Sequence, residues 1–411
     1  MKRCLALLMV AHIAALADNL VVHEWGTFTS LMGSDGKRQE GMHQEEEALP
    51  DFVYGFSHPQ NEAAIKMAGR CGHVKLPCAT LHNLAQDKQP SDIMPKNPLG
   101  AGITQKMETP VIYFYGDVGQ RVQVTVDFPQ GIISQYYPRA ASYAPSYNEI
   151  SSLGPSTFSF DVELLAPDNI NDLPKTTANS IWNPSRVVKA NTIRAQDEHE
   201  KFIFYRGVGD FDAGIVVTND GRRVTINNQS PQTISRAFIL NFDGSKGVIN
   251  DIGAIASQKS VAIPKTSLSE SDYIAQAKNL IVSALVQEGL FLDEAQGLVN
   301  TWEKSYFKTQ GTRILYLVPR SETDRIIPLK VNPAPSKLVR VLVGRIEVMS
   351  KTEEDLLAQK IVRNPSLDMR KELGHYAEPK LRRVLSILHH GKAKNVGPAI
   401  TAIHRMLGKT N

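Results

Sequence analysis

The pattern of hydrophobic and polar positions divides the chain into strand-like and helix-like stretches. Runs of β-branched and aromatic residues predict strands at residues 110–116, 121–129, 157–165, 201–207, 213–220, 222–229 and 235–244. Four residues separate the first two runs, which predicts a β-hairpin. Short strands separated by Asp-Gly and Asn-Asp-Gly turns are typical of an antiparallel β-sandwich or barrel.

A helical pattern follows the strands. Apolar residues recur at helical spacing through residues 270–307, with Ser269 as a cap and Gly289 as a stop, which predicts a helical hairpin. Strand patterns return at residues 312–319, 324–331 and 337–349, and short helices are predicted in the last 60 residues, including 353–362 and 379–390.

Together these patterns predict an α+β fold with an antiparallel β-sandwich-like core, a loop-rich N-terminal region, a helical hairpin and a C-terminal helical tail. The predicted organisation is a signal peptide at 1–17, a loop-rich region at 18–105, a β-sandwich-like domain at 106–265, the hairpin plus strands at 266–350 and the helical tail at 351–411.

The first residues have the features of a signal peptide. Lys2 and Arg3 precede an apolar run, and Ala15 and Ala17 place small residues where a signal peptidase cleaves. The run is too short to span a bilayer, and no later stretch reaches the roughly 20 apolar residues that spanning needs. The sequence predicts export to the periplasm or the extracellular space, without a membrane span.

Composition and charge do not indicate a nucleic-acid partner. Of the 411 residues, 42% are hydrophobic, as in an ordinary folded protein, and the formal net charge is +4. Cleavage after Ala17 removes Lys2 and Arg3 but no acidic residue, which lowers +4 to +2. The remaining basic residues are scattered, so no nucleic-acid binding is predicted.

Two cysteines remain after cleavage, Cys71 and Cys78. A neighbouring pair in an exported protein predicts a disulfide bond. The alternative is a zinc site, because His73 and His82 complete a Cys-x-His-x4-Cys-x3-His pattern.

Residues 21–58 hold the densest group of possible metal ligands. Two imidazoles and a carboxylate can hold a zinc ion and leave one position open for an activated water. The predicted ligands are His23, His43, Glu45, Glu46 and, from a distant segment, His199. Glu24 would point to the opposite face of a strand from its neighbour, so it is the predicted base. A solvated turn and a structural histidine are the alternative interpretation.

Arg206 is the second candidate for catalysis. A strand through residues 201–207 would place it on one face with Phe202 and Phe204, and it leads into a glycine-rich segment. Its guanidinium could clamp a carboxylate or phosphate with two hydrogen bonds. The alternative is a structural ion pair with Asp210 or Asp212.

The tyrosine-rich segment 136–147 allows two interpretations. Tyrosines between Pro, Ala and Ser can stack on sugar rings, or they can pack a long loop onto the sandwich.

Four segments in order, HEWGTFTS (23–30), METPVIYFY (107–115), EKFIFYRGVGDF (200–211) and residues 311–347, resemble an uncharacterised family of exported bacterial proteins. The resemblance implies export but carries no activity, cofactor or catalytic residue. The chain departs from the family at Gln135, where the family has an acidic residue, which argues against an essential carboxylate there.

Two functions are consistent with these features. The first is a divalent-metal-dependent hydrolase that acts on an envelope or extracellular polymer, which requires His23, His43 and the glutamates to converge in a cleft. The alternative is a non-catalytic β-sandwich protein that binds glycan or protein, in which these residues are dispersed and an exposed aromatic face is the main feature.

Overall fold

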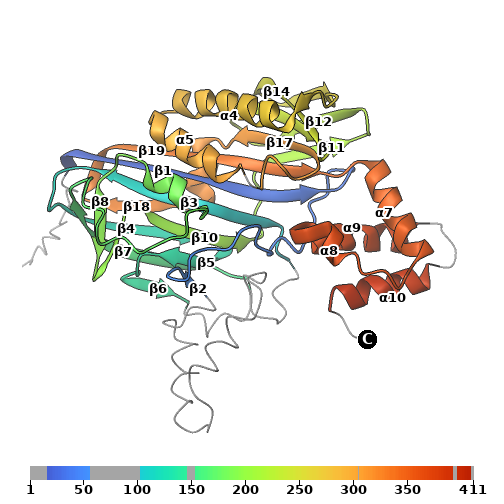
Figure 1. Ribbon diagram of the computed structural model, residues 1–411, viewed down its shortest axis with the longest axis horizontal. Helices are drawn as coiled ribbons and strands as arrows, with labels where there is room; N and C mark the ends of the chain where they lie inside the picture. The colour runs from blue at the N-terminus through green and yellow to red at the C-terminus, as the bar shows by residue number, and fades with distance from the viewer. Residues whose placement is uncertain (1–15, 56–101, 146–152, 304, 392–395, 409–411) are drawn as a thin grey trace, which may run out of the picture.

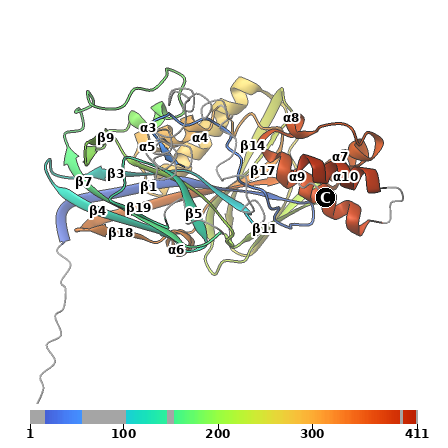
Figure 2. The same ribbon diagram turned by 90° about the horizontal axis from the view of Figure 1, so that it is seen from below.

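A ten-stranded sheet forms the centre of the molecule in the computed structural model, which describes residues 16–55, 102–145, 153–303, 305–391 and 396–408 (Figure 1). Smaller sheets cover one face of this large sheet, helices cover the other, and a helical lobe lies at one end (Figures 1 and 2). The predicted α+β, sandwich-like fold is confirmed.

The middle of the large sheet joins strands that lie far apart in the sequence. β1 (Leu16–Met32) pairs in parallel with β19 (Ala334–Val348) and antiparallel with β3 (Gln105–Tyr115). Residues 18–32 are therefore a central strand and not the predicted loop-rich region. Both faces of β1 are buried, so it lacks the alternation of polar and apolar residues that identifies a half-exposed strand.

The remaining strands extend the large sheet in both directions. Beyond β3 lie β10 (Ile203–Gly209), β5 (Gly131–Tyr137) and β2 (Tyr54–Gly55). Beyond β19 lie β17 (Gly311–Leu317), β13 (Ile234–Phe242), β14 (Lys246–Ile255) and β16 (Leu268–Ser269). Because β13 pairs with β17, the predicted boundary at residue 265 does not separate two structural units.

Two smaller sheets form the second layer. One contains β18 (Leu329–Asn332), β4 (Arg121–Phe128), β7 (Ser156–Leu165), β8 (Thr192–Ala195) and β9 (Glu198–Glu200), with β6 (Ser142–Ala144) beside β7. The other contains β11 (Ile215–Asn219), β12 (Arg223–Asn228) and β15 (Gln258–Ala262). The predicted hairpin of residues 110–116 with 121–129 is wrong, because β3 and β4 lie in different sheets. Their connecting turn carries the chain from one layer to the other, and Ile112 and Val124 share the core between the layers.

The opposite face of the large sheet is covered by α3 (Asn183–Arg186), α4 (Glu270–Gln287) and α5 (Leu292–Thr301). These helices pack on a second core that includes Trp25 and Tyr113. The predicted helical hairpin is confirmed: the Ser269 side chain accepts a hydrogen bond from the Asp272 N–H, and Gly289, with φ of 108°, follows the end of α4. A short helix, α6 (Arg320–Ile326), replaces the first part of the strand predicted at 324–331.

The predicted helical tail is confirmed as a helical lobe, whose core also includes Leu31, Ile132 and Val208 of the large sheet. The lobe contains α7 (Lys351–Arg363), α8 (Arg370–Leu373), the 3-10 turn η2 (Gly374–Tyr376), α9 (Ala377–His390) and α10 (Gly397–Met406). Arg383 of α9 pairs within the lobe with Glu354 of α7 at 2.7 Å, and it connects the lobe to the turn after β1 through Asp35 at 3.0 Å. In the described part of the chain, no helix is both long and apolar enough to cross a membrane.

Candidate functional site

Glu24 is enclosed between the two sheet layers and is fully buried. Its carboxylate accepts hydrogen bonds from the Tyr205 hydroxyl and from Arg340 Nε, both at 2.5 Å. Arg340 in turn donates to Asp324 at 2.7 Å. Glu24 therefore connects β1, β10 and β19 through internal bonds, and does not stand at an open surface as a base would.

His23 points to the helix-covered face, opposite to Glu24 as predicted. The ring is fully buried beneath α5, with Nδ1 2.8 Å from Glu294 Oε2 and the ring centroid 4.6 Å from that of Phe291. The other Glu294 oxygen accepts a hydrogen bond from the Tyr115 hydroxyl at 2.8 Å. Sequence reasoning did not find Glu294, because it is 271 positions away from its histidine.

The other predicted ligands face different partners. His43 Nε2 lies 3.4 Å from the Glu378 carboxylate of α9, and Glu45 forms an ion pair with Arg206. Glu46 is 2.8 Å from Arg345 and 2.9 Å from His375. His199 lies in the smaller sheet, opposite Arg194.

The structure therefore does not bring the predicted metal ligands together. Among the described residues, no three His, Cys, Asp or Glu side chains are grouped so that they could hold one metal ion. Cys71, Cys78, His73 and His82 lie outside the described residues.

A row of buried polar side chains crosses one end of the helix-covered face, and we call it the charged row. It draws on the neighbouring strands β17, β19, β1, β3 and β10. Its members are Arg313, Arg345, Glu347, Thr29, Lys106, Glu108 and Arg206. Alternation along β3 from Val111 would place Met107 on this face, but the pairing of β1 with β3 is irregular between Trp25 and Thr27 and turns Lys106 and Glu108 to it instead. Strand pairing then aligns the row, as in the register of Thr29 with Arg345 and with Lys106.

The charged row is internally neutralised. Lys106 Nζ lies 2.5 Å from Glu108, whose second oxygen accepts a hydrogen bond from Thr29 at 2.6 Å. Glu347 Oε1 forms ion pairs with Arg345 Nε at 2.8 Å and with Arg313 Nε at 3.2 Å. With Glu45 and Glu46 from the loop after β1, four carboxylates balance four cations, namely Lys106, Arg206, Arg313 and Arg345. Such a balanced network has no excess charge with which to attract a charged substrate.

The charges of this network shift the pKa of the Glu46 carboxyl. Burial alone would raise the pKa of its carboxyl, but Arg345 and His375 outweigh burial and hold that pKa well below its ordinary range. The alternative considered for Arg206 is corrected: Asp210 accepts a hydrogen bond from Thr104, and Asp212 lies 3.8 Å from Arg38. Arg206 shares a face with Phe202 and Phe204 as predicted, but it points into the charged row.

The tyrosines do not form an exposed stacking surface within the described part of the chain. Tyr136 stacks on Tyr54 at 5.4 Å and on Tyr143 at 5.7 Å between ring centroids, and Tyr54 and Tyr137 are buried. The packing interpretation of this segment is the one that the geometry favours.

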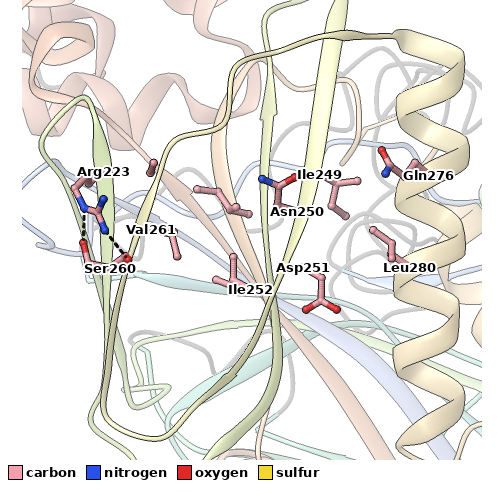
Figure 3. A pocket seen from close by; sticks show the side chains of 11 residues that line it. Arg223, Ile249, Asn250, Asp251, Ile252, Ser260, Val261, Gln276 and Leu280 are labelled. Atoms are coloured by element: carbon pink, nitrogen blue, oxygen red, sulfur yellow. Dashed lines mark hydrogen bonds between the residues drawn. The ribbon is translucent and has the colours of Figure 1, made fainter.

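A groove of about 620 Å³ opens between β14, β15, β12 and α4 (Figure 3). Four consecutive residues of β14, from Ile249 to Ile252, line it, and so do Ser260, Val261 and Ala262 of β15. Side chains of a strand alternate between its faces, so consecutive residues share a cavity only where it runs along the strand's edge. The groove therefore exposes the edges of two strands.

A β-bulge explains why β14 and β15 separate. Phe238 of β13 pairs with Asp251 and Ala237 pairs with Gly253, which leaves Ile252 as an extra residue. Gly253 has a φ of 68°, a conformation that glycine adopts without strain. A bulge bends and twists its strand. After the bulge, β15 pairs with β12 of the smaller sheet. Sequence reasoning predicted neither strand.

No model of a known protein family matches the sequence, and no curated protein matches it. The geometry of the chain is therefore the basis on which its function has to be inferred.

Proposed function

We propose that the protein is an exported, non-catalytic binding protein that holds an extended segment of another protein in the groove between β14, β15 and α4. The observation that carries the proposal is the pair of strand edges along the groove (Figure 3): β15 ends its sheet, and β14 pairs with β16 only at Lys246 and Gly247. A volume of about 620 Å³ lies within the roughly 300–1,000 Å³ that ligand sites occupy.

The lining favours a polypeptide over a glycan. It includes the aliphatic side chains of Ile249, Ile252, Val261 and Leu280, and none of its residues is aromatic. Sugar rings are commonly held by stacking on aromatic side chains, which the groove does not offer. Open strand edges offer N–H and C=O groups in the spacing of an extended polypeptide backbone.

The hydrolase hypothesis has less support, because its predicted residues already have partners. His23 contacts Glu294, Glu45 contacts Arg206 and Glu46 contacts Arg345. Each would have to leave a buried partner before it could join a common metal site, and breaking a buried ion pair such as Glu46 with Arg345 typically costs about 3–5 kcal/mol.

Export remains part of the proposal on the strength of the signal-peptide pattern. The strand register is compatible with it. Pairing of β1 with β19 is irregular after Ala17 and resumes at Val21, so cleavage after Ala17 would leave the regular part of the ladder intact.

The test begins with the mature protein immobilised and a phage-displayed library of random heptapeptides. We expect selected peptides to bind the wild type and to bind Leu280→Glu at least ten-fold more weakly, because the new carboxylate projects into the groove. The matched control is Leu356→Glu on α7, a change at an exposed leucine in the helical lobe. Circular dichroism confirms that both variants are folded.

Selection of no specific peptide, or equal binding to wild type and Leu280→Glu, would overturn the proposal. Binding of a soluble glycan panel that is lost in Leu280→Glu would show that the groove holds carbohydrate instead, and would also overturn it.

A further inference from the structure

We propose that the bound segment joins the large sheet as an additional strand on the outer edge of β14, in a seat formed by residues 248–251; this deepens the proposed function and rests on it. Strand addition uses main-chain hydrogen bonds for affinity and side-chain pockets for specificity.

The length of the seat follows from what occupies the rest of the edge. β16 pairs only with Lys246 and Gly247 of β14, so the described chain leaves the edge open from Val248 onward. Beyond Asp251 the bulge interrupts the ladder. There Lys259 Nζ donates to the Ile252 carbonyl and lies 3.4 Å from that of Ala254. Four residues therefore remain along the open edge. Successive residues of a strand direct their N–H and C=O groups to opposite edges. Gly247 accepts a hydrogen bond from Ser267 on the outer edge, so Ile249 and Asp251 are the residues that offer their backbone groups there.

Lysine and a bulge are common means of protecting a sheet edge from unwanted pairing. In this chain they protect only the half of β14 that follows Asp251. The half that precedes the bulge faces the groove, where Asn250 and Asp251 are exposed. Protection of one half and exposure of the other is what a site for a short added strand requires.

The side chains around the seat define the ligand. On one side of the sheet edge, Ile249 and Leu280 belong to the core beneath the helices, and on the other, Ile252 and Val261 belong to the core between the layers. An added strand would place alternate side chains on these two aliphatic surfaces. We therefore expect a run of aliphatic residues, as in strands buried on both faces.

Arg223 adds a charge preference. Its guanidinium is held at the groove by Ser260, with Nε 3.0 Å from the hydroxyl and Nη2 2.8 Å from the carbonyl (Figure 3). No carboxylate of the described residues forms an ion pair with it, whereas Asp251 is already paired with Arg236 at 2.6 Å. The occupant is therefore an extended aliphatic segment of a partner protein that carries an acidic residue beside Arg223.

The first experiment tests strand pairing. The probe is a fluorescein-labelled peptide with a Val-Ile-Val-Ile core preceded by Glu, and fluorescence anisotropy measures its binding to the mature protein. Two further versions carry N-methyl groups on alternate residues, so that each version blocks one edge of the peptide. We expect one version to lose at least ten-fold in affinity and the other to bind like the parent.

The outcomes separate the two proposals. One outcome is that both methylated versions bind like the parent, and that all three peptides bind the Leu280→Glu variant more weakly than the wild type. In that case the groove binds peptides but strand addition is wrong. If the parent does not bind while library-selected peptides do, the aliphatic ligand is wrong and groove binding stands. If no peptide binds, both proposals fail.

The second experiment tests the charge preference with Arg223→Gln and a probe in which Gln replaces Glu. We expect Arg223→Gln to lower the affinity for the Glu probe about ten-fold and to leave the affinity for the Gln probe unchanged. Arg222→Gln is the matched control, because Arg222 is an exposed neighbour that does not line the groove. Equal losses for both probes would refute the role of Arg223.

Discussion

Arg345 Nη1 donates a hydrogen bond to Glu46 Oε1 at 2.8 Å, although the two residues are 299 positions apart in the sequence. Arg345 belongs to the central strand β19 and Glu46 to the loop that follows β1. His375 and Tyr376 of the helical lobe contact the same carboxylate at 2.9 and 3.2 Å. A single buried carboxylate thus joins the sheet, a loop and the lobe.

Replacement of Glu46 by Gln should destabilise the fold by about 3–5 kcal/mol, because it leaves the buried Arg345 guanidinium without its charged partner. Urea unfolding measures the change in free energy. The control is Asp355→Asn, which breaks an exposed pair with Lys351 one helical turn away and should change the free energy of unfolding by about 0.5 kcal/mol or less. A loss in Glu46→Gln as small as in the control would contradict the structural role.

Acid should weaken the same contact. Because the folded pKa of Glu46 is held well below the ordinary value of 4.5, the unfolded chain takes up the proton more readily. The stabilisation from this carboxylate is therefore complete above pH 4.5 and is lost as the pH falls through the folded pKa. Urea unfolding of wild type and Glu46→Gln between pH 7 and pH 3 should show the difference between them shrinking with acid. A constant difference would show that this carboxylate does not titrate with a lowered pKa.

Glu24→Gln and Tyr205→Phe should differ in severity. The first leaves the buried Arg340 short of its nearest carboxylate and should cost about 3–5 kcal/mol in unfolding free energy. The second removes one hydroxyl that donates to Glu24 and should cost about 1.5–3 kcal/mol. Chemical denaturation of both variants checks the order. If Tyr205→Phe were the more damaging change, the central position of the Glu24–Arg340 pair would be wrong.

His23→Ala should lower stability by about 1–3 kcal/mol, because it leaves the buried Glu294 carboxylate without the imidazole. It should leave the zinc content of the purified protein unchanged, since the other predicted ligands have separate partners. Elemental analysis of wild type, His23→Ala and the control His199→Ala decides the matter. Stoichiometric zinc in the wild type that disappears in His23→Ala would restore the hydrolase hypothesis.

The correct and incorrect sequence predictions differ in how local their signals are. The cap at Ser269, the stop at Gly289 and the helical spacing between them all lie within one segment, and α4 formed as predicted. Residues 110–116 and 121–129 were recognised as strands by the same kind of signal, but the hairpin between them was not formed. The choice of partner strand depends on which layer buries each apolar face, and a short window of sequence does not contain that information.

In the candidate site, too, local signals predicted side-chain directions correctly but did not predict distant partners. Alternation along a strand correctly placed His23 and Glu24 on opposite faces and grouped Arg206 with Phe204. The partners Glu294, Arg340 and Glu45 come from distant segments, and nothing in the spacing near the predicted residues pointed to them.

The sequence by itself determined the α+β composition, the positions of strands such as β7, β13 and β19, the hairpin of α4 and α5, and the helical tail, because periodicity, caps and turn residues act over a few positions. Only the tertiary structure decided that β1 lies beside β19, that the acidic loop neutralises the charged row, and that a bulge at Ile252 opens a groove. These features depend on contacts between residues far apart in the chain, where burial and charge pairing select one arrangement from many that the local pattern allows.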